Sequence, residues 1–449
     1  MKIIHKNKTF SSSQIIILGF LAVILIGTFL LMLPFSTKGH GCASFMDSLF
    51  TATSAVCVTG LVVHDTATYW SQFGQAVILI MIQIGGMGVV TVAVAIAILS
   101  GRKIGLMQRS TMQEALAAPK MGGIVRLTGF ILKATIAIEM IGAVLLSFVF
   151  VPQLGPEKGI WYSLFHSVSA FCNAGFDLMG IKEHFSSLTS YMGQPLVNLV
   201  IMCLIIIGGV GFLTWDDIRV NKHHLAKYRM QSKIILSVTL ILIVFPALYF
   251  YFCEFSRPEW SMLSGKEKIL AAAFQSVTPR TAGFNTIDMT KLTESGQMIT
   301  VILMIIGGSP GSTAGGIKTT TLAVLVVSAI AVFNRKSQGQ CFGRRIPQDA
   351  VVNAATILSM YLMLFVSGAI VISSVEGLPI LTCLFETASA IGTVGLSLGV
   401  TPGLCTFSKV VLVCLMFLGR VGALTLVFAA LSRKHANISR YPEEKITVG

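Results

Sequence analysis

Eight long apolar runs constrain this chain more than any other feature of its sequence. They cover residues 14–34, 74–99, 125–151, 195–215, 234–253, 299–333, 350–375 and 408–431. A bilayer span needs about 20 consecutive apolar residues, so each run is long enough to cross a membrane. Only 12% of the residues are charged, against about 25% in a soluble domain. The sequence therefore predicts an all-α membrane protein with eight transmembrane helices, and excludes a soluble enzyme with a membrane anchor.

The lysines and arginines gather in alternate connections between the runs. They lie in the first ten residues, in 101–126, in 216–233, in 335–345 and after residue 432. Such an excess is typical of the cytoplasmic segments of a membrane protein. We therefore expect a multi-pass protein of the cell membrane with both termini in the cytoplasm. The net charge of +14 then reflects topology and contact with the lipid bilayer, not a nucleic-acid partner.

A short amphipathic segment recurs four times in the connections on the other side. It is too short to cross the membrane, which indicates a re-entrant helix. The copies end at glycines spaced 108 to 115 residues apart, namely Gly60, Gly175, Gly283 and Gly395. In the following run of each unit a second motif recurs, in residues 84–88, 207–211, 306–311 and 418–422.

Two motifs that recur in the same order indicate internal duplication. We expect four repeats of span, short pore helix, filter loop and span, around one central pseudo-fourfold pore. Their predicted bounds are 1–100, 101–216, 217–334 and 335–449.

The four glycine loops have the features of an ion filter. Non-helical backbone at membrane depth is stable only inside the protein or along a wet cavity. Glycine adopts positive φ, which lets successive carbonyls point the same way, and a ring of carbonyls can replace the hydration shell of potassium. The alternative is that the glycines only permit close helix packing, which explains the first two copies of the second motif about as well as a function does. The backbone groups that we expect to bind the ion belong to Cys57, Val58, Thr59, Gly60, Cys172, Asn173, Ala174, Gly175, Arg280, Thr281, Ala282, Gly283, Gly392, Thr393, Val394 and Gly395.

These motifs resemble the Trk/Ktr/HKT superfamily of potassium transporters over essentially the whole chain. The loops Val-Thr-Gly-Leu, Asn-Ala-Gly-Phe, Pro-Arg-Thr-Ala-Gly-Phe and Thr-Val-Gly-Leu carry the resemblance, with the glycine-rich segment that ends at Lys318. The chain looks closest to the bacterial Ktr-type membrane subunit. The resemblance implies potassium uptake into a bacterial cell, a homodimer, and a cytosolic nucleotide-binding ring that regulates opening. It implies no covalent cofactor and leaves the role of sodium open. Cys57 and Cys172 are less typical of the family.

The run 299–333 differs from the others because its middle has poor helix propensity. We expect an intramembrane loop there that gates the path below the filter, as the resemblance also implies; a simple kinked helix is the alternative. The predicted gate consists of Gly307, Gly308, Ser309, Pro310, Gly311, Ser312, Thr313, Ala314, Gly315, Gly316, Lys318 and Arg420.

Charged residues within apolar runs are candidates for function. We expect Arg420 to hydrogen-bond carbonyls of the loop and to oppose cations. Lys318 either anchors the loop or extends toward the cytoplasm. Glu139 is more often a satisfied structural carboxylate than a proton relay, and the side chain of Arg280 is expected to pair with an outer acid such as Glu386.

Three other functions fit the sequence less well. The segment from Gly311 to Thr319 is similar to a phosphate-binding loop, but it has an inserted Ile317 and follows no strand. A secondary transporter with alternating access usually has two inverted halves, whereas the four units here have the same order. A membrane enzyme would need a catalytic constellation, and none is evident. The basic segments 101–126 and 216–233 are candidates for docking the regulatory ring.

Overall fold

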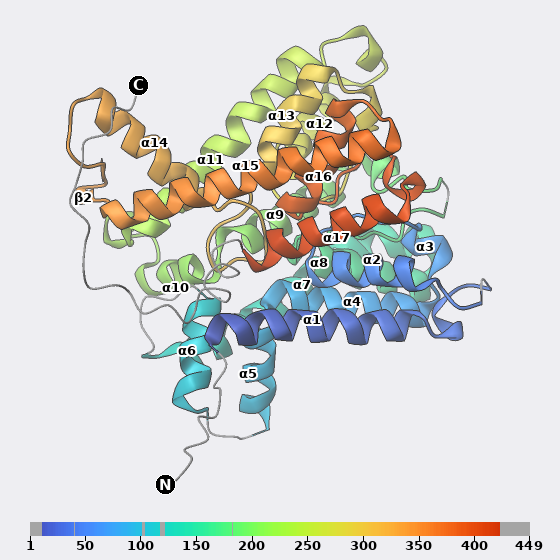
Figure 1. Ribbon diagram of the computed structural model, residues 1–449. Coiled ribbons are helices and arrows are strands. Elements are labelled where there is room, and N and C mark those ends of the chain that lie inside the picture. Colours follow the sequence, from blue (N-terminus) through green and yellow to red (C-terminus); the bar gives the residue numbers. More distant parts are fainter. Residues whose placement is uncertain (1–10, 40, 101–103, 117–121, 182, 423–449) are drawn as a thin grey trace.

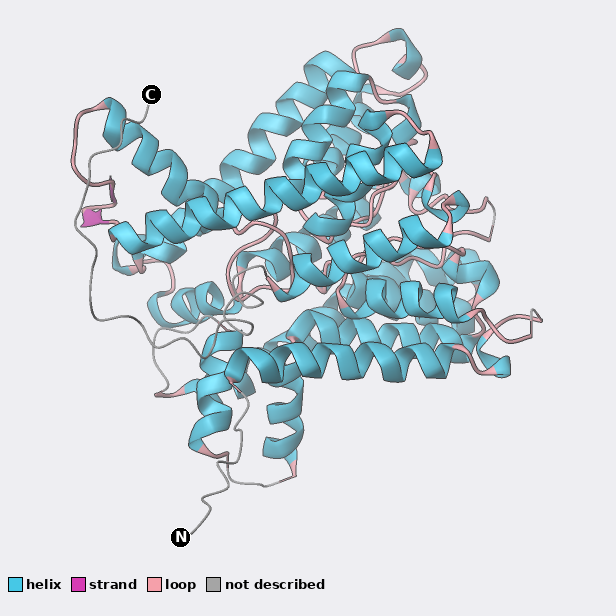
Figure 2. Cartoon of the chain, in the orientation of Figure 1, coloured by secondary structure: helices cyan, strands magenta, loops and turns pink. Residues whose placement is uncertain are grey.

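The computed structural model describes residues 11–39, 41–100, 104–116, 122–181 and 183–422 (Figure 1). Helices dominate this part of the chain, as Figure 2 shows. The strands found in it are β1 (Gln340–Cys341) and β2 (Arg344–Arg345), which pair antiparallel in one small hairpin. The chain is therefore a helical protein, as its apolar runs predicted.

Four helices in the described part are each long and apolar enough to cross a membrane by themselves. They are α1 (Ser12–Leu31), α7 (Ile124–Leu154), α11 (Met230–Tyr249), which continues as a π-helix over Phe250–Glu254, and α15 (Gln348–Glu376). Each presents large apolar side chains on its outside, for example Phe29, Phe148, Phe245 and Met363. Such surfaces are stable against lipid and not against water. These helices match the predicted runs 14–34, 125–151, 234–253 and 350–375.

A short helix follows each long helix and packs against it. The four short helices are α2 (Phe45–Val56), α8 (Pro156–Phe171), α12 (Gly265–Val277) and α16 (Ile380–Gly392). Side chains cap two of them: Ser44 caps α2, and Ser264 and Glu267 form a capping box on α12. Each short helix leads into one of the segments that end at Gly60, Gly175, Gly283 and Gly395, which we call the glycine turns.

A second set of helices returns from the glycine turns. It comprises α4 (Gln72–Met87) with α5 (Val89–Leu99), α9 (Pro195–Val210) with α10 (Phe212–Asn221), α13 (Glu294–Ile305) with α14 (Thr319–Phe333), and α17 (Thr406–Val421). The predicted spans over 74–99 and 195–215 are each interrupted by a sharp bend, which the sequence did not predict. Helix α5 is bent by 95° from α4, and α10 by 93° from α9.

Glycines with positive φ cause these bends. Gly88 has a φ of 85° and Gly211 a φ of 97°, values that interrupt a right-handed helix and that side-chain-bearing residues rarely adopt. Gly422 has a φ of 88° at the end of α17. The rest of the run 408–431 lies outside the described residues. Both chain termini also lie outside them, so the predicted cytoplasmic location of the termini stays a prediction.

The run 299–333 is interrupted by residues 306–318, which form the loop between α13 and α14. The alternative of a simple kinked helix is therefore wrong. The two ends of this loop are tied together by a parallel bridge between Ile306 and Ile317. Poor helix formers, above all Pro310 and the surrounding glycines, explain why no helix continues through it.

The remaining elements lie at the two ends of the long helices. Helices α5, α10 and α6 (Leu106–Ala115) and the β-hairpin lie toward one end, on the left of Figure 1, and α3 (Thr66–Tyr69) lies at the other. Short 3₁₀ turns complete the described chain. They are Pro34–Ser36, Thr189–Tyr191, Leu225–Lys227, Pro258–Trp260, Met289–Lys291 and Thr401–Gly403.

Candidate ion filter and gate

The four glycine turns share an unusual backbone conformation. The residue two positions before each glycine has positive φ although it carries a side chain: 58° at Val58, 59° at Asn173, 68° at Thr281 and 52° at Thr393. The glycines have φ values between 69° and 97°. Four copies of a conformation that is rare outside glycine indicate a common requirement. Positive φ therefore alternates with ordinary φ from residue to residue in each turn, and this alternation aims successive carbonyls in one direction.

The glycine turns meet in a closed ring. A Cβ atom added to Gly60 would lie within 3.0 Å of the carbonyl oxygen of Ala174, the residue before Gly175. The same overlap relates Gly175 to Ala282, Gly283 to Val394, and Gly395 to Thr59. Each glycine therefore touches the backbone of the next unit, and the last touches the first. The ring brings together the predicted residues of all four units and leaves no room for a side chain at any of the four glycines.

Hydroxyl groups at the ends of the short helices fix the turns. The hydroxyl of Ser54 accepts a hydrogen bond of 3.0 Å from the Gly60 amide, and Ser389 does the same for Gly395. Ser169 donates to the carbonyl of Phe176 at 2.7 Å. These three serines lie six residues before their glycines, so the repeat alignment already contained the signal that the sequence analysis missed. In the third unit the neighbouring Thr278 donates to the carbonyl of Phe284 instead.

The first glycine of the second motif supports the short helix from behind. A Cβ on Gly85 would overlap the carbonyl oxygen of Val56, and one on Gly208 that of Phe171. These oxygens belong to the last residues of α2 and α8, and Gly419 contacts Ile391 near the end of α16 in the same way. Close packing therefore accounts for these glycines. In the first two units the last glycine of the motif, Gly88 or Gly211, has the separate role of bending the helix.

A cavity of about 850 Å³ opens on the ring from the side of α3. All four ring glycines line it, and so do the residues two positions further along each unit: Val62, Asp177, Asn285 and Ser397. Acidic residues predominate among its charged groups, which comprise Asp65, Asp177, Glu183, Glu259, Asp288 and Lys291. An excess of negative charge around a cavity raises the local concentration of cations.

Asp177 is the acidic group nearest to the ring in sequence, two residues after Gly175. Burial raises the pKa of its carboxyl to about 7, and the nearby charge of Asp65 acts in the same direction. Hydrogen bonds from the Met179 amide and from Ser187 oppose the shift in pKa. Asp65 has a different role, because its carboxylate accepts from the amides of Ala67, Thr68 and Phe185 and so fixes the surrounding loops.

The 306–318 loop packs against the bend between α9 and α10. The Ser309 amide donates to the carbonyl of Gly209 at 3.0 Å, and the Phe212 amide donates to the carbonyl of Gly311 at 2.7 Å. The loop also contacts the ring. A Cβ on Gly315 would overlap the side chain of Thr393, so the predicted gate and the predicted filter touch each other.

Arg420 and Lys318 both donate to backbone carbonyls. Arg420 donates to Thr313 in the loop, as expected, and also to Gly85 and to Gly86 near the end of α4. Lys318 donates to Ala314 at 2.8 Å and to Gly315 at 3.3 Å, so it anchors the loop and does not extend toward the cytoplasm. Among the described residues, no carboxylate lies within ion-pair distance of Arg420 or Lys318. Their charges are therefore not neutralised where they meet the loop.

The predicted pairing of Arg280 with Glu386 is wrong. The Glu386 carboxylate accepts from Ser397, Thr401 and the Leu398 amide, and thereby closes the outer loop after the fourth glycine turn. Arg280 donates instead to the hydroxyl of Thr239 on α11 at 3.5 Å. Both side chains are buried, and the hydrogen bonds that each makes go to other residues and not to the predicted partner.

Glu139 has the surroundings of a structural carboxylate. It accepts from the Gln83 amide at 3.1 Å, and the thiol of Cys172 lies 3.9 Å from its other oxygen. Cys172 and Cys57 are both fully buried behind the ring. The two cysteines therefore belong to the packing that supports the turns.

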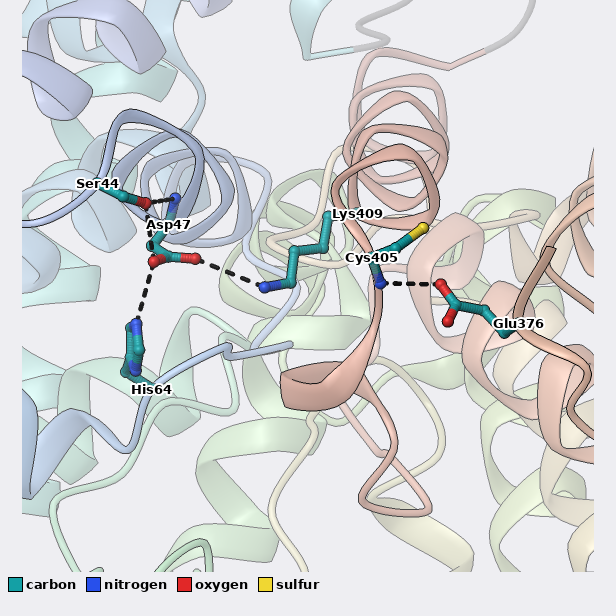
Figure 3. A network of polar contacts seen from close by, with 6 residues as sticks. All are labelled: Ser44, Asp47, His64, Glu376, Cys405 and Lys409. Atoms are coloured by element: carbon teal, nitrogen blue, oxygen red, sulfur yellow. Dashed lines mark hydrogen bonds and ion pairs between the residues drawn. The ribbon is translucent and has the colours of Figure 1, made fainter.

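Polar contacts join the first and fourth units (Figure 3). Asp47, in the first turn of α2, lies 3.2 Å from His64 and 3.6 Å from Lys409 on α17. Partial burial raises the pKa of Asp47, but the hydrogen bonds from Ser44 and His64 and the neighbouring positive charges bring it below its usual range. Glu376, at the end of α15, accepts from the Cys405 amide at the start of α17.

The chain matches known transport proteins over nearly its whole length. A model of the TrkH family, described as a cation transport protein, matches residues 5–441. The potassium/sodium uptake protein NtpJ of Enterococcus hirae is 43% identical to it, with 99% of this chain and 98% of that protein covered. Ktr system potassium uptake protein B of Bacillus subtilis is 42% identical, with 98% and 97% covered.

Among solved structures, the crystal structure of the potassium transporter TrkH from Vibrio parahaemolyticus has a similar fold. The TM-score is 0.74 over 95% of this chain and 86% of that chain, at 20% sequence identity.

Proposed function

This chain belongs to the TrkH family of cation transport proteins, and we propose that it takes up potassium through a filter made by the four glycine turns. The observation that carries the proposal is the closed ring of Gly60, Gly175, Gly283 and Gly395, each against the backbone of the next unit. Backbone carbonyls of the turns replace the hydration shell of the ion. The relatives named for potassium or potassium/sodium uptake support this substrate.

The ring belongs to a pore built from four repeats and eight spans. The repeats are 1–100, 101–216, 217–334 and 335–449, each with a span, a short pore helix, a glycine turn and a second span. Support comes from the order of long helix, short helix, turn and returning helix, which occurs four times in the described chain. In this proposal α4 with α5, and α9 with α10, are spans that bend near one end.

The 306–318 loop acts as the gate beneath the filter. It contacts Thr393 of the fourth turn, and it is held in place by Arg420 and Lys318. Both residues bring positive charge close to the path, where the low dielectric of the membrane makes charge interactions strong. The loop therefore slows cations by obstruction and by electrostatic repulsion until it moves.

The assembly follows from the family resemblance. The subunit forms a homodimer in the bacterial cell membrane with both termini in the cytoplasm, and a cytosolic nucleotide-binding ring controls opening. The basic segments 101–126 and 216–233 provide docking sites for that ring. Sodium stimulates uptake or follows potassium through the pore, in agreement with the name of the Enterococcus relative.

Flux measurements on the purified chain in liposomes test the proposal. A potassium gradient should drive uptake of trace rubidium without any proton or sodium gradient, and excess sodium should compete weakly. Strict dependence on a counter-ion gradient would instead favour an alternating-access transporter and contradict the pore.

A further inference from the structure

A buried threonine of the loop reaches the second glycine turn directly. The hydroxyl of Thr313 lies 3.2 Å from the carbonyl oxygen of Phe171, the last residue of α8, and 3.3 Å from the side-chain oxygen of Asn173. Thr313 is also the loop residue whose carbonyl accepts from Arg420. One residue therefore connects the arginine that holds the loop with the backbone and side chain of a filter turn.

Asn173 passes this contact on to the third turn. Its amide nitrogen lies 3.2 Å from the hydroxyl of Thr281, and both side chains are buried. If the amide is rotated by half a turn, its oxygen accepts from Thr281 and its nitrogen donates to Phe171 and Ile205. The contact between Asn173 and Thr281 exists in both orientations. In the rotated orientation the Asn173 amide donates to the Phe171 carbonyl, which also accepts from Thr313, so this carbonyl then joins the loop to Asn173.

The residues involved occupy one equivalent position in the repeats. Val58, Asn173, Thr281 and Thr393 each lie two residues before a ring glycine and each have positive φ. The loop contacts Asn173 through Thr313 and Thr393 through Gly315, and it reaches Thr281 through Asn173. Val58, in the first unit, has an apolar side chain that can make no such hydrogen bond.

We propose that Asn173 is a positioning residue that holds the second and third filter turns against the closed loop, so that ion selectivity depends on the position of the loop. This inference rests on the proposed filter and gate. Withdrawal of Thr313 removes a hydrogen-bond donor from the buried Phe171 carbonyl and, in the unrotated orientation, from the Asn173 side-chain oxygen, which is unfavourable. The filter turns then relax or the amide takes the alternative orientation. Because coupling between two sites is reciprocal, the ions in the filter also affect the stability of the closed loop.

The test uses the full chain in potassium-uptake-deficient cells and in liposomes, and measures the ratio of potassium to sodium uptake. Thr313→Val removes the hydroxyl at nearly unchanged size, and we expect the ratio to fall roughly two- to tenfold, as for the loss of one buried hydrogen bond. Thr313→Ser keeps the hydroxyl and should restore the ratio of the parent. Thr128→Val is the matched control, because the hydroxyl of this buried threonine donates to the Ile124 carbonyl within α7 and touches neither the loop nor the filter turns.

A double-variant cycle separates coupling from a general loss of structure. Asn173→Leu should lower the ratio by itself, and adding Thr313→Val should lower it little further, because both changes break the same connection. Additive effects, or a parental ratio in Thr313→Val, would overturn the inference. If Asn173→Leu does not accumulate as folded protein, the comparison of Thr313→Val with Thr313→Ser decides. Gly60→Ser identifies where a failure lies: an unchanged ratio there contradicts the filter itself, whereas a lowered ratio beside a parental Thr313→Val contradicts only the coupling.

Discussion

Gly395 lies against the carbonyl oxygen of Thr59, so closely that a Cβ atom on this glycine would overlap it. The two residues are separated by most of the chain, yet they complete the ring that Gly60, Gly175 and Gly283 begin. The contact converts four similar loops into one site with a single axis. In the proposed pore, a cation that passes this ring meets the backbone of all four units.

Arg420→Ala should increase potassium flux per folded molecule. The substitution removes the hydrogen bonds to Thr313, Gly85 and Gly86 and a positive charge that no described carboxylate neutralises. We expect an increase of about tenfold, which corresponds to a barrier lowered by about 1.4 kcal/mol. Uptake into potassium-starved cells, normalised to detergent-stable protein, measures it. Arg420→Lys keeps the charge, so its flux should lie between that of the parent and that of Arg420→Ala. Flux at or below the parental value in Arg420→Ala would assign the arginine a structural role.

Deletion of residues 310–312 should also raise flux, and the potassium-to-sodium ratio should fall only as far as the shortened loop draws Thr313 away from the second glycine turn. These residues lie beside the bend between α9 and α10, whereas Thr313 and Gly315, which contact the filter turns, remain. Flux per folded molecule and the potassium-to-sodium ratio are measured together in liposomes. A lower folded yield without a gain in flux would mean that the loop serves mainly to support the fold.

Potassium uptake at limiting concentration should depend on the outside pH through Asp177. With a pKa of about 7, this carboxyl is mostly ionised at about pH 8 and mostly protonated at about pH 6. Uptake should therefore fall as the pH is lowered, because the negative charge beside the ring is lost. Asp177→Asn should lower uptake at about pH 8 and flatten the profile. Asp288→Asn, an exposed acid on the same cavity, is the control and should keep the parental profile; an equal slope in Asp177→Asn would contradict this role.

The same shift in pKa affects stability with the opposite sign from a salt-bridged carboxylate. The folded state disfavours the ionised form of Asp177, so this group destabilises the fold to its full extent above about pH 7; the cost then declines as the pH falls below the raised pKa and vanishes only below the ordinary value of 3.8. Asp177→Asn should therefore raise the melting temperature at about pH 8 more than at about pH 6. An equal change at both values would mean that the carboxyl titrates near its ordinary pKa.

Lys409→Met should reduce stability slightly and leave selectivity unchanged. The ion pair with Asp47 is partly exposed, and such pairs contribute about 0–1 kcal/mol. The pKa of Asp47 is lowered in the folded state, so its stabilising effect is present at neutral pH and is lost as the pH falls below the usual carboxyl range. Thermal unfolding in detergent at neutral and at acidic pH measures the difference. A changed ion ratio would show that the network in Figure 3 acts on the filter.

The repeated motifs predicted the four glycine turns, because glycines at a fixed place in each unit are required both by φ and by the space beside the next backbone. They also predicted the bond from Arg420 to the loop, since this arginine replaces a glycine of the motif in one unit only. The bends at Gly88 and Gly211 were missed because hydropathy measures apolar length and not backbone direction.

Contacts between distant residues were beyond the reach of the sequence patterns. Thr313 meets Asn173 across 140 positions of the chain, and nothing in either local segment predicts the other as a partner. The expected pair of Arg280 and Glu386 failed for the same reason: both are charged and buried, but Glu386 is positioned by α16 and Arg280 by the turn that follows α12. Pairing by charge alone ignores where the helices place the side chains.

The ion ratio of Gly60→Ser tests the central claim most directly. A serine at this position must adopt a positive φ, at a cost of about 1–3 kcal/mol, and its Cβ meets the carbonyl of Ala174. We expect the potassium-to-sodium uptake ratio to fall about tenfold or more, with a similar fall in Gly283→Ser and no fall in Gly399→Ser, a glycine in the outer loop with open space around it. A parental ratio in both ring variants, at normal folded yield, would contradict a carbonyl filter formed by the glycine turns.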